Sequence, residues 1–335
     1  MKKKLKTIIV GTGGMARNHL NNMLDQKRST QVQAFVEISE ESRNKVQEIY
    51  TQRRIKCPNF YDSIKSLLKN EPKPDAAFII TPHKYHFKNT SDCLNAGLDV
   101  LLEKPMVMNT KEAKKLIKLR DKTQKILVVA FPGSLSPAIQ KAKKVITNGV
   151  IGQINGVCAF AHQNWKSLSQ GSWRQEPDIS GGGFLFDTGS HMINSMVDLM
   201  GKPISEVTAC FDNSGTKVDI NGAVIGRFSS GQFFSLSAVG DSINCNGAIR
   251  IFGDKGILET GIWGKYLKLL KEGETEYKPV SFPKSTGVWE QFLKVLNGKI
   301  ENPCPAEVGL RFSQLMDMIT LSAKNGKTTQ AKQVR

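Results

Sequence analysis

Two stretches of the sequence combine acidic, basic and cationic side chains in a way that could move a proton. In LLEKPM, at residues 101–106, Lys104 follows an apolar run and is followed by a proline. In SGGGFLFDTGSHMINSMVD, at residues 180–198, Asp187 and His191 are four residues apart. On one helix these two side chains would share a face, where the carboxylate could orient the imidazole. These residue types favour acid–base chemistry, with the lysine stabilising developing negative charge.

Each stretch also has an interpretation without chemistry. Residues 101–106 taken alone could be a surface turn, because lysine is seldom buried. Residues 180–198 taken alone could be a capped helix with a polar face, which Asn194 and Asp198 continue. The surrounding elements must decide between these interpretations.

A glycine-rich segment, GTGGMA at residues 11–16, has the G-x-G-x-x-G/A pattern of dinucleotide-binding loops. Gly11 permits a tight turn, Gly13 allows a pyrophosphate to approach the backbone, and Ala16 permits close helix–strand packing. Glu37 follows Ala16 by 21 residues, where an acid binds the ribose 2′-hydroxyl. This acid favours NAD, because a carboxylate repels a 2′-phosphate, while a nearby serine and arginine leave NADP as the alternative.

The first third of the chain alternates apolar strands with amphipathic helices, which is typical of a doubly wound parallel sheet. A strand is also predicted around Ile55, and Asp62 is predicted to cap the next helix. The predicted strands are 5–10, 32–36, 76–80, 99–103 and 126–131, and the predicted helices are 14–25, 40–50, 64–68, 85–96 and 111–125.

Beyond residue 132 short strands predominate, which predicts a second, largely antiparallel sheet. We therefore expect a Rossmann domain at residues 1–131 and an α/β substrate-binding and oligomerisation domain at residues 132–335, whose last helices can pack back on the first. The strand-like segments are 154–161, 204–211, 218–228, 231–239, 247–252 and 264–270, followed by helices at 288–296 and 306–323.

The composition excludes several classes of function. With 39% hydrophobic and 23% charged residues, the 335-residue chain resembles ordinary globular proteins, and no apolar run approaches the ~20 residues of a membrane span. The apolar stretch near the N-terminus is too short for a signal peptide, so we expect a cytoplasmic protein. The net charge of +17 raises the question of nucleic acid, but the lysines of residues 111–125 fit a solvated helix face. No nucleic-acid partner is expected.

The six cysteines lack a C-x-x-C pair, which favours reduced and mostly buried thiols over a disulfide framework. The close histidine pair, His83 and His86, is on a different stretch from His191. No metal site is expected.

With both sites in view, the chain resembles the glucose–fructose oxidoreductase / inositol dehydrogenase / rhizopine-catabolism family (Gfo/Idh/MocA) over nearly its whole length. The joint occurrence of EKP and GGG-x-x-x-D-x-G-x-H is the most specific part of the resemblance. The other matching segments are the glycine loop, TPHKYH (81–86), NGVIGQI (148–154), WRQEPDIS (173–180), IFGDKGILE (251–259) and NPCPAEVGLR (302–311).

The resemblance implies an NAD(P)-dependent oxidoreductase that transfers a hydride between nicotinamide and a sugar or polyol. It also implies a homodimer or homotetramer formed through the second sheet. The implied catalytic residues are Lys104, Asp187 and His191. The implied cofactor contacts are Gly11, Gly13, Gly14, Met15, Ala16, Glu37, Thr81, Pro82, His86, Glu103 and Lys104. The implied substrate contacts are Lys104, His162, Trp173, Arg174, Asp187 and His191.

The chain departs from the family pattern at two places. Many members carry an acid three residues after the histidine, where this chain has Asn194, with Asp198 a turn later. Many also carry arginines after the sixth strand, where this chain reads PGSLSP at 132–137. The substrate's identity, and whether Lys104 or His191 is the base, therefore stay open.

Two other functions are consistent with the same fold. One is a glycosidase that retains NAD and uses transient oxidation, and the other is a non-catalytic dinucleotide sensor. The lysine, aspartate and histidine argue against the sensor, which has no need of proton transfer.

Overall fold

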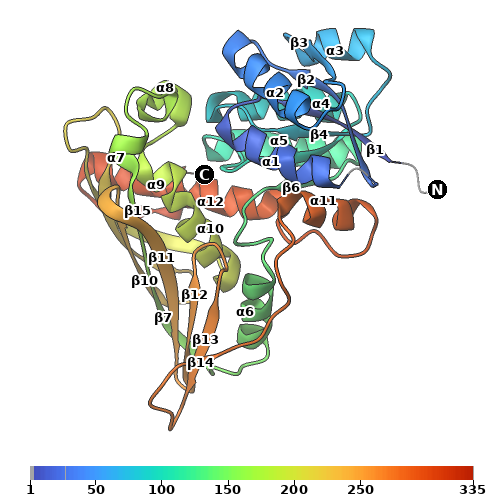
Figure 1. Ribbon diagram of the computed structural model, residues 1–335. Helices are drawn as coiled ribbons and strands as arrows, with labels where there is room; N and C mark the ends of the chain where they lie inside the picture. The colour runs from blue at the N-terminus through green and yellow to red at the C-terminus, as the bar shows by residue number, and fades with distance from the viewer. Residues whose placement is uncertain (1–3, 27, 335) are drawn as a thin grey trace.

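The computed structural model describes residues 4–26 and 28–334, which form two sheets with helices around them (Figure 1). The first is a six-stranded parallel sheet in the order β3-β2-β1-β4-β5-β6. Its strands are β1 (Leu5–Val10), β2 (Thr30–Val36), β3 (Asn59–Tyr61), β4 (Ala76–Ile79), β5 (Asp99–Leu102) and β6 (Leu127–Val129).

Helices cover both faces of this sheet, so its central strands are apolar throughout. In β1, Ile8 and Ile9 are at most 1% exposed. The strand order reverses between β1 and β4, and in such sheets ligands bind beyond the carboxyl ends of the strands at the reversal. The helices of this part are α1 (Gly14–Asp25), α2 (Glu40–Gln52), α3 (Ile64–Asn70), α4 (His86–Asn95) and α5 (Thr110–Thr123).

The second sheet has nine strands in the order β14-β13-β12-β11-β7-β10-β9-β8-β15. All neighbouring pairs in it are antiparallel except β7 and β10, as the largely antiparallel prediction requires. Its strands are β7 (Ile154–Asn164), β8 (Ile204–Asp212), β9 (Asn221–Phe228), β10 (Phe233–Val239), β11 (Asp241–Gly253), β12 (Gly256–Gly261), β13 (Leu267–Lys271), β14 (Lys278–Pro279) and β15 (Thr329–Gln330).

One face of the second sheet is covered and the other is open. Along β7, Val157, Ala159 and Ala161 are buried, whereas Cys158 and Phe160 on the alternate face are exposed. Helix α10 packs against β7, and α12 packs against β8. The helices between the two sheets in sequence, and around the second, are α6 (Pro137–Thr147), α7 (Trp165–Leu168), α8 (Pro177–Ser180), α9 (Phe184–Asp187) and α10 (Gly189–Met200).

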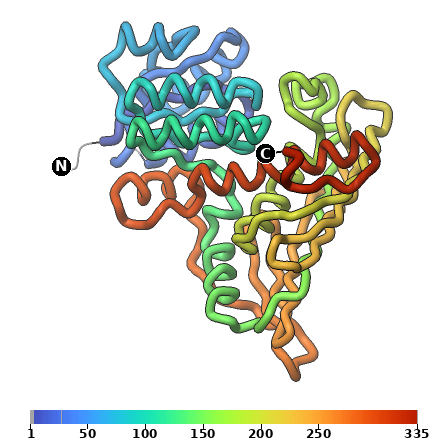
Figure 2. Tube along the Cα trace, turned by 180° about the vertical axis from the view of Figure 1, so that it is seen from behind, coloured from blue at the N-terminus to red at the C-terminus, as the bar shows by residue number. Residues whose placement is uncertain are grey.

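The last two long helices, α11 (Val288–Leu296) and α12 (Ala306–Asn325), return to the first sheet (Figure 2). Trp289 on α11 is 2% exposed, stacks on Phe78 of β4 with ring centroids 6.0 Å apart, and donates from Nε1 to Thr30 Oγ1 at 2.9 Å. Helix α12 contacts both α5 and β8, so it packs against both halves of the chain.

Some local predictions are wrong. Ile55 lies in the turn after α2 rather than in a strand, and the third strand forms at Asn59–Tyr61. The cap of α3 is Ser63, whose hydroxyl accepts from Ser66 N–H, while Asp62 pairs with Arg43. Helix α6 and strand β12 were not predicted, although a serine followed by proline is a common helix start.

Helix α5 has the solvated, lysine-rich face that was predicted. Its exposed lysines are Lys111, Lys114, Lys115, Lys118 and Lys122. Within residues 4–26 and 28–334, no helix has the length and apolar character that a membrane span requires.

Candidate functional site

The glycine loop has the geometry that a dinucleotide pyrophosphate needs. Gly11 has φ +88°, and a Cβ there would lie 2.7 Å from the Ile80 carbonyl oxygen, so glycine is required. A Cβ on Gly13 would meet no described atom within 4 Å, which leaves open space beside the loop. Helix α1 begins at Gly14 without a side-chain cap, so its first N–H groups can bind an anion.

The remaining loop residues divide between packing and exposure. Ala16 is 2% exposed and packs in the core, whereas Met15 is 48% exposed. The small side chain at position 16 therefore does what the loop pattern predicts.

Glu37 is bound by the chain itself. Its Oε2 accepts from Thr12 N–H at 2.7 Å and from Thr12 Oγ1 at 2.9 Å, and its Oε1 accepts from Ile38 and Ser39 N–H, both at 2.8 Å. The carboxylate thus connects the glycine loop to the end of β2, where a ribose hydroxyl would have to share it.

The turn at residues 81–86 and the EKP turn lie against each other. His86 is buried, with Nδ1 2.8 Å from the Pro105 carbonyl oxygen and Nε2 2.8 Å from that of Thr81. The backbone of Pro82 begins a short 3₁₀ turn at His83–Tyr85. In these contacts His86 supports the turn that carries Lys104.

Glu103 has a partner that the sequence did not reveal. His19 Nε2 on α1 is 2.8 Å from Glu103 Oε1, while Glu103 Oε2 accepts from Lys104 N–H at 3.0 Å. Burial raises the pKa of Glu103, but the interactions with His19 and then with Lys104 together outweigh it, so that the pKa is lowered. The carboxylate therefore links α1 to the backbone of Lys104.

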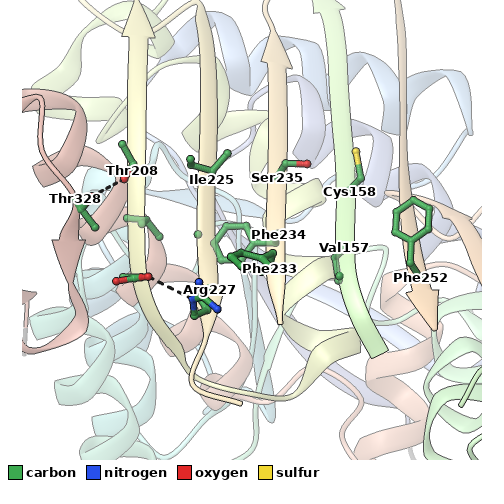
Figure 3. A pocket seen from close by; sticks show the side chains of 14 residues that line it. Val157, Cys158, Thr208, Ile225, Arg227, Phe233, Phe234, Ser235, Phe252 and Thr328 are labelled. Carbon is green, nitrogen blue, oxygen red and sulfur yellow. Dashed lines mark hydrogen bonds and ion pairs between the residues drawn. The ribbon is translucent and has the colours of Figure 1, made fainter. Parts of the chain in front are cut away.

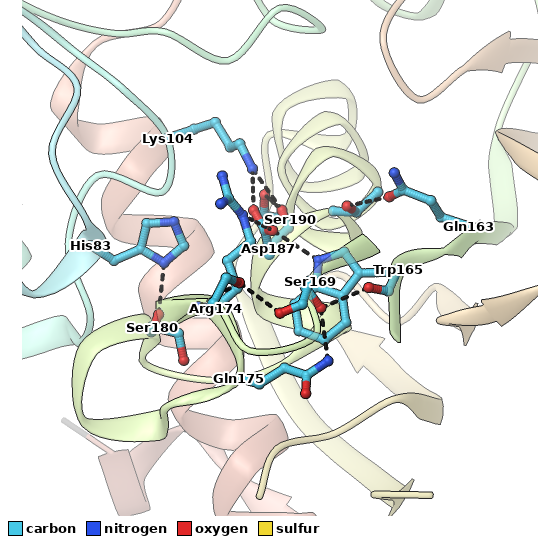
Figure 4. Close-up of polar contacts among 12 residues, drawn as sticks. His83, Lys104, Gln163, Trp165, Ser169, Arg174, Gln175, Ser180, Asp187 and Ser190 are labelled. Carbon is cyan, nitrogen blue, oxygen red and sulfur yellow. Dashed lines mark hydrogen bonds and ion pairs between the residues drawn. The ribbon is translucent and has the colours of Figure 1, made fainter. Parts of the chain in front are cut away.

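Lys104 and Asp187 meet although 83 residues separate them (Figure 4). Lys104 Nζ donates to Asp187 Oδ1 at 2.8 Å, and their side chains are 13% and 10% exposed. The other oxygen, Oδ2, accepts from Trp165 Nε1 at 2.9 Å and from Arg174 Nε at 3.0 Å. Burial opposes ionisation of Asp187, but Lys104 and then Arg174 hold its pKa well below the usual range.

The predicted continuous helix from Asp187 to His191 is interrupted. Helix α9 ends at Asp187 and α10 begins at Gly189, and the N–H of His191 donates to the Thr188 carbonyl. The Asp187 carbonyl instead accepts from Lys104 Nζ at 2.9 Å and from Ser190 Oγ. The lysine therefore competes for a backbone acceptor that would otherwise continue the helix.

His191 is not oriented by Asp187, contrary to the prediction. All the side-chain hydrogen bonds of Asp187 in the described structure go to Lys104, Trp165 and Arg174. The imidazole lies between the rings of Phe131 and Trp263, with centroids 6.1 and 5.7 Å away. Burial, followed by the charge of Lys104, lowers the pKa of His191 well below its usual value, so the ring is neutral at pH 7.

Two models of one family match most of the chain. Residues 5–131 match the model described as an oxidoreductase family with an NAD-binding Rossmann fold, and residues 139–259 match the GFO/IDH/MocA C-terminal domain. The chain belongs to the GFO/IDH/MocA oxidoreductase family. The fold and family inferred from the sequence are thus confirmed.

Relatives within the GFO/IDH/MocA family differ in how much of the chain they match. Oxidoreductase P35 of Formosa agariphila is 24% identical over 95% of this chain and 99% of its own length. D-glucoside 3-dehydrogenase of Escherichia coli is 30% identical over 43% and 42% of the two chains. The scyllo-inositol 2-dehydrogenase (NADP(+)) of Bacillus subtilis is 29% identical over 41% of this chain and 37% of its own length.

Solved GFO/IDH/MocA structures share the fold. Levoglucosan dehydrogenase, solved with NADH and levoglucosan, superposes with a TM-score of 0.84 at 20% identity and covers 98% of this chain and 100% of its own. Aldose-aldose oxidoreductase from Caulobacter crescentus, solved with glycerol, has a TM-score of 0.82 at 22% identity, with the same coverage. At these identities the likeness shows the fold alone.

Of the substrate contacts that the GFO/IDH/MocA resemblance implied, not all lie beside Lys104 and Asp187. Trp173 lies next to Arg174, whose guanidinium is 4.6 Å from the Trp173 ring centroid. His162, in contrast, is on the open face of β7, stacked on Phe160, whereas Gln163 on the covered face accepts from Thr188 Oγ1 at 2.7 Å. His162 is therefore replaced by Gln163 as the β7 residue beside the site.

His83 is a further residue of this region that the sequence did not single out as a contact. Its ring lies edge-on to Trp173 with centroids 4.8 Å apart, and Nδ1 is 2.7 Å from the Ser180 carbonyl oxygen. Burial lowers the pKa of His83 to about 3, so the ring is neutral. It thereby joins the TPHKYH turn to α8 across the site.

Proposed function

We propose that the chain is an NAD-dependent dehydrogenase that oxidises a hydroxyl of a sugar, polyol or sugar derivative, or runs the reverse reduction. The observation that carries this proposal is the 2.8 Å contact between Lys104 Nζ and Asp187 Oδ1 beside a neutral His191, at the carboxyl end of a Rossmann sheet. Such an arrangement offers positive charge and a proton acceptor together, as alcohol oxidation requires.

The roles of the residues follow from their charges. Bound nicotinamide supplies the hydride chemistry. His191, as a neutral imidazole, accepts the hydroxyl proton, and Lys104 stabilises the negative charge that develops on oxygen. Asp187 holds Lys104 in position and does not act as a base, because three donors bind its carboxylate.

The substrate class is supported by the names of the relatives. They include a D-glucoside 3-dehydrogenase, a scyllo-inositol 2-dehydrogenase and a levoglucosan dehydrogenase, whose names specify sugars or polyols. The test is formation of reduced nicotinamide, followed by absorbance, across a panel of inositols, aldoses and glycosides. Hydrolysis of glycosides without net reduction would favour the NAD-retaining glycosidase, and NAD binding without any turnover would favour the sensor.

Glu37 sets the preference for NAD in this proposal. Glu37→Ala removes a charged acceptor, so we expect the NAD dissociation constant to rise about tenfold while NADP binding is weakened less or improved. The measurement is titration of both cofactors by intrinsic fluorescence.

Glu37 also binds the glycine loop, so a matched control is needed. Thr12→Val removes the hydroxyl that donates to Glu37 but keeps the carboxylate and the backbone donor. It should weaken NAD and NADP equally. If the ratio of the NAD and NADP dissociation constants is the same in Glu37→Ala as in the wild type, the reason for choosing NAD is removed.

We also propose that the open face of the second sheet joins two copies of the chain, as the family resemblance implies. This face holds a pocket of about 510 Å³ that includes Cys158, Ile225 and Phe233 (Figure 3). Ile225 and Phe233 are 61% and 59% exposed. Large apolar side chains together on one surface are typical of an interface.

Ile225→Glu is therefore expected to convert the oligomer to a monomer, because it places a charge in the interface. The molar mass in solution, measured by light scattering after size exclusion, checks this. Ile55→Glu is the matched control, because Ile55 is 47% exposed on the first half of the chain and should leave the mass unchanged. A wild-type protein that is already monomeric would contradict the proposal.

In this proposal residues 1–131 bind the cofactor, and residues 132–335 bind the substrate and the second copy. A cytoplasmic location stays a prediction from the sequence.

A further inference from the structure

Three buried polar atoms without a protein partner lie on helix α10. They are His191 Nδ1, Asn194 Oδ1 and Asp198 Oδ2, and no group in the described part of the chain pairs with them. Asn194 and Asp198 are 0% and 2% exposed. Their spacing of three and then four residues places all three side chains on one face of the helix.

The other polar atoms of Asn194 and Asp198 are already bound. Asn194 Nδ2 donates to Ser134 Oγ at 2.8 Å, in the segment between β6 and α6. Asp198 Oδ1 accepts from Lys143 Nζ of α6 at 2.9 Å, with Arg311 of α12 at 3.7 Å. These contacts fix both side chains and leave one acceptor oxygen on each.

Water is the natural partner of these atoms. A buried polar atom left unpaired costs about 1–3 kcal/mol, so native proteins satisfy such atoms with protein groups or ordered water. Side chains three or four residues apart on a helix have Cβ atoms about 5–6 Å apart. One water with two hydrogen bonds spans that distance.

We propose that Asn194, acting through ordered water on this face of α10, holds His191 in the tautomer that carries its proton on Nδ1. A water that donates one hydrogen to Asn194 Oδ1 and the other, through a second water, toward Asp198 Oδ2 has used both its hydrogens. It can therefore only accept from His191 Nδ1. The Nε2 lone pair is then available to a substrate hydroxyl. The inference rests on the proposed dehydrogenase function for its kinetic consequence, but not for the tautomer itself.

This arrangement assigns Asn194 the orienting role that Asp187 lacks. The charged groups facing His191 are Lys104 and Asp187, and those facing Asp198 are Lys143 and Arg311. Asn194 offers an acceptor without adding a charge. It orients the imidazole without favouring its protonated form.

The direct test is nitrogen NMR of the full-length protein labelled with ¹⁵N-histidine. The chain has five histidines, and His191→Gln identifies the signals of His191. The wild type should show a protonated Nδ1 and an unprotonated Nε2, and Asn194→Leu should produce a mixture or the other tautomer. A wild type protonated on Nε2, or a tautomer unchanged by Asn194→Leu, overturns the proposal.

Asn194→Asp keeps the size of the side chain and serves if the leucine variant does not fold. A negative charge near the ring favours its protonated form, so the pKa of His191 should rise by about one unit, seen in the same NMR titration. An unchanged pKa overturns the proposal.

Kinetics provide a second readout. Asn194→Leu should lower kcat about a hundredfold with little change in KM for NAD. Ser195→Ala is the matched control, since Ser195 is buried on the same helix and its hydroxyl binds the Ile262 carbonyl. It should leave the tautomer and kcat unchanged. If no substrate is turned over, the proposed function fails, and the NMR result still decides the tautomer.

Discussion

Lys104→Met is expected to lower kcat for alcohol oxidation about a thousandfold, because it removes the positive charge beside the reacting oxygen. The variant keeps a side chain of similar length, and Asp187 retains its bonds from Trp165 and Arg174. NAD affinity should fall far less than kcat, because Lys104 is one of many implied cofactor contacts. The measurement is steady-state turnover of the responding substrate together with a cofactor titration.

Lys166→Met is the matched control for this prediction. Lys166 follows Trp165 on α7, but its ammonium pairs with Asp241 at 3.2 Å, and its side chain is 35% exposed. Its loss should leave kcat unchanged. Wild-type turnover in Lys104→Met would show that the charge does not act on the substrate.

The same variant has a consequence for the pH profile. Lys104 is one of the two causes that lower the pKa of His191, the larger being burial. Without the lysine charge that pKa should rise part of the way back. Because His191 must be neutral to accept a proton, the acid limb of kcat/KM should move to higher pH.

Asp187→Asn is expected to reduce the free energy of unfolding by about 3 kcal/mol, because it leaves the cations of Lys104 and Arg174 without their counter-charge. The pair is buried, with side chains 13% and 10% exposed for the lysine and the aspartate. Denaturation by urea, monitored by circular dichroism, measures the difference. Asp241→Asn, which breaks the exposed pair with Lys166, should change stability by less than about 0.5 kcal/mol.

The pH dependence of this difference has a definite sign. Lys104 and Arg174 keep the pKa of Asp187 in the folded protein below its unfolded value of about 4. The stabilisation is therefore complete above that pH and is lost as the pH falls through the folded pKa. The free energies of unfolding of the wild type and of Asp187→Asn should show their full difference at pH 7, and this difference should shrink as the pH falls into the acid range. An equal difference at all pH values would mean that the charge is not its cause.

Local sequence patterns predicted most of the fold because the first sheet is built from regular alternations of apolar strands and helices. The end of β5 at Leu102 and the limits of α1 and α11 were predictable, since glycines, prolines and apolar spacing lie within a few residues of each. The convergence of the EKP turn with Asp187 was predictable from the family resemblance rather than from either segment alone.

The site predictions that were wrong or missing concern residues whose conformation or contacts depend on residues far away in the sequence. Where the helix through Asp187 is interrupted, Lys104, which is far away in sequence, binds the Asp187 carbonyl. His162 and Gln163 are neighbours in sequence, but alternate residues of a strand face opposite sides, so an error of one position changes the face. His19 gave no local signal, because its partner Glu103 follows β5 and is 84 positions away in the sequence.

The contact of Trp289 with Thr30 and Phe78 also has a consequence for biosynthesis. When the ribosome has made the first six strands, the indole that closes over β4 is still about half a chain away from being synthesised. The nascent sheet therefore emerges with an apolar surface that its own residues do not cover. That surface is covered only after α11 has been synthesised. Residues 1–131 expressed alone should therefore aggregate rather than fold as an independent nucleotide-binding domain.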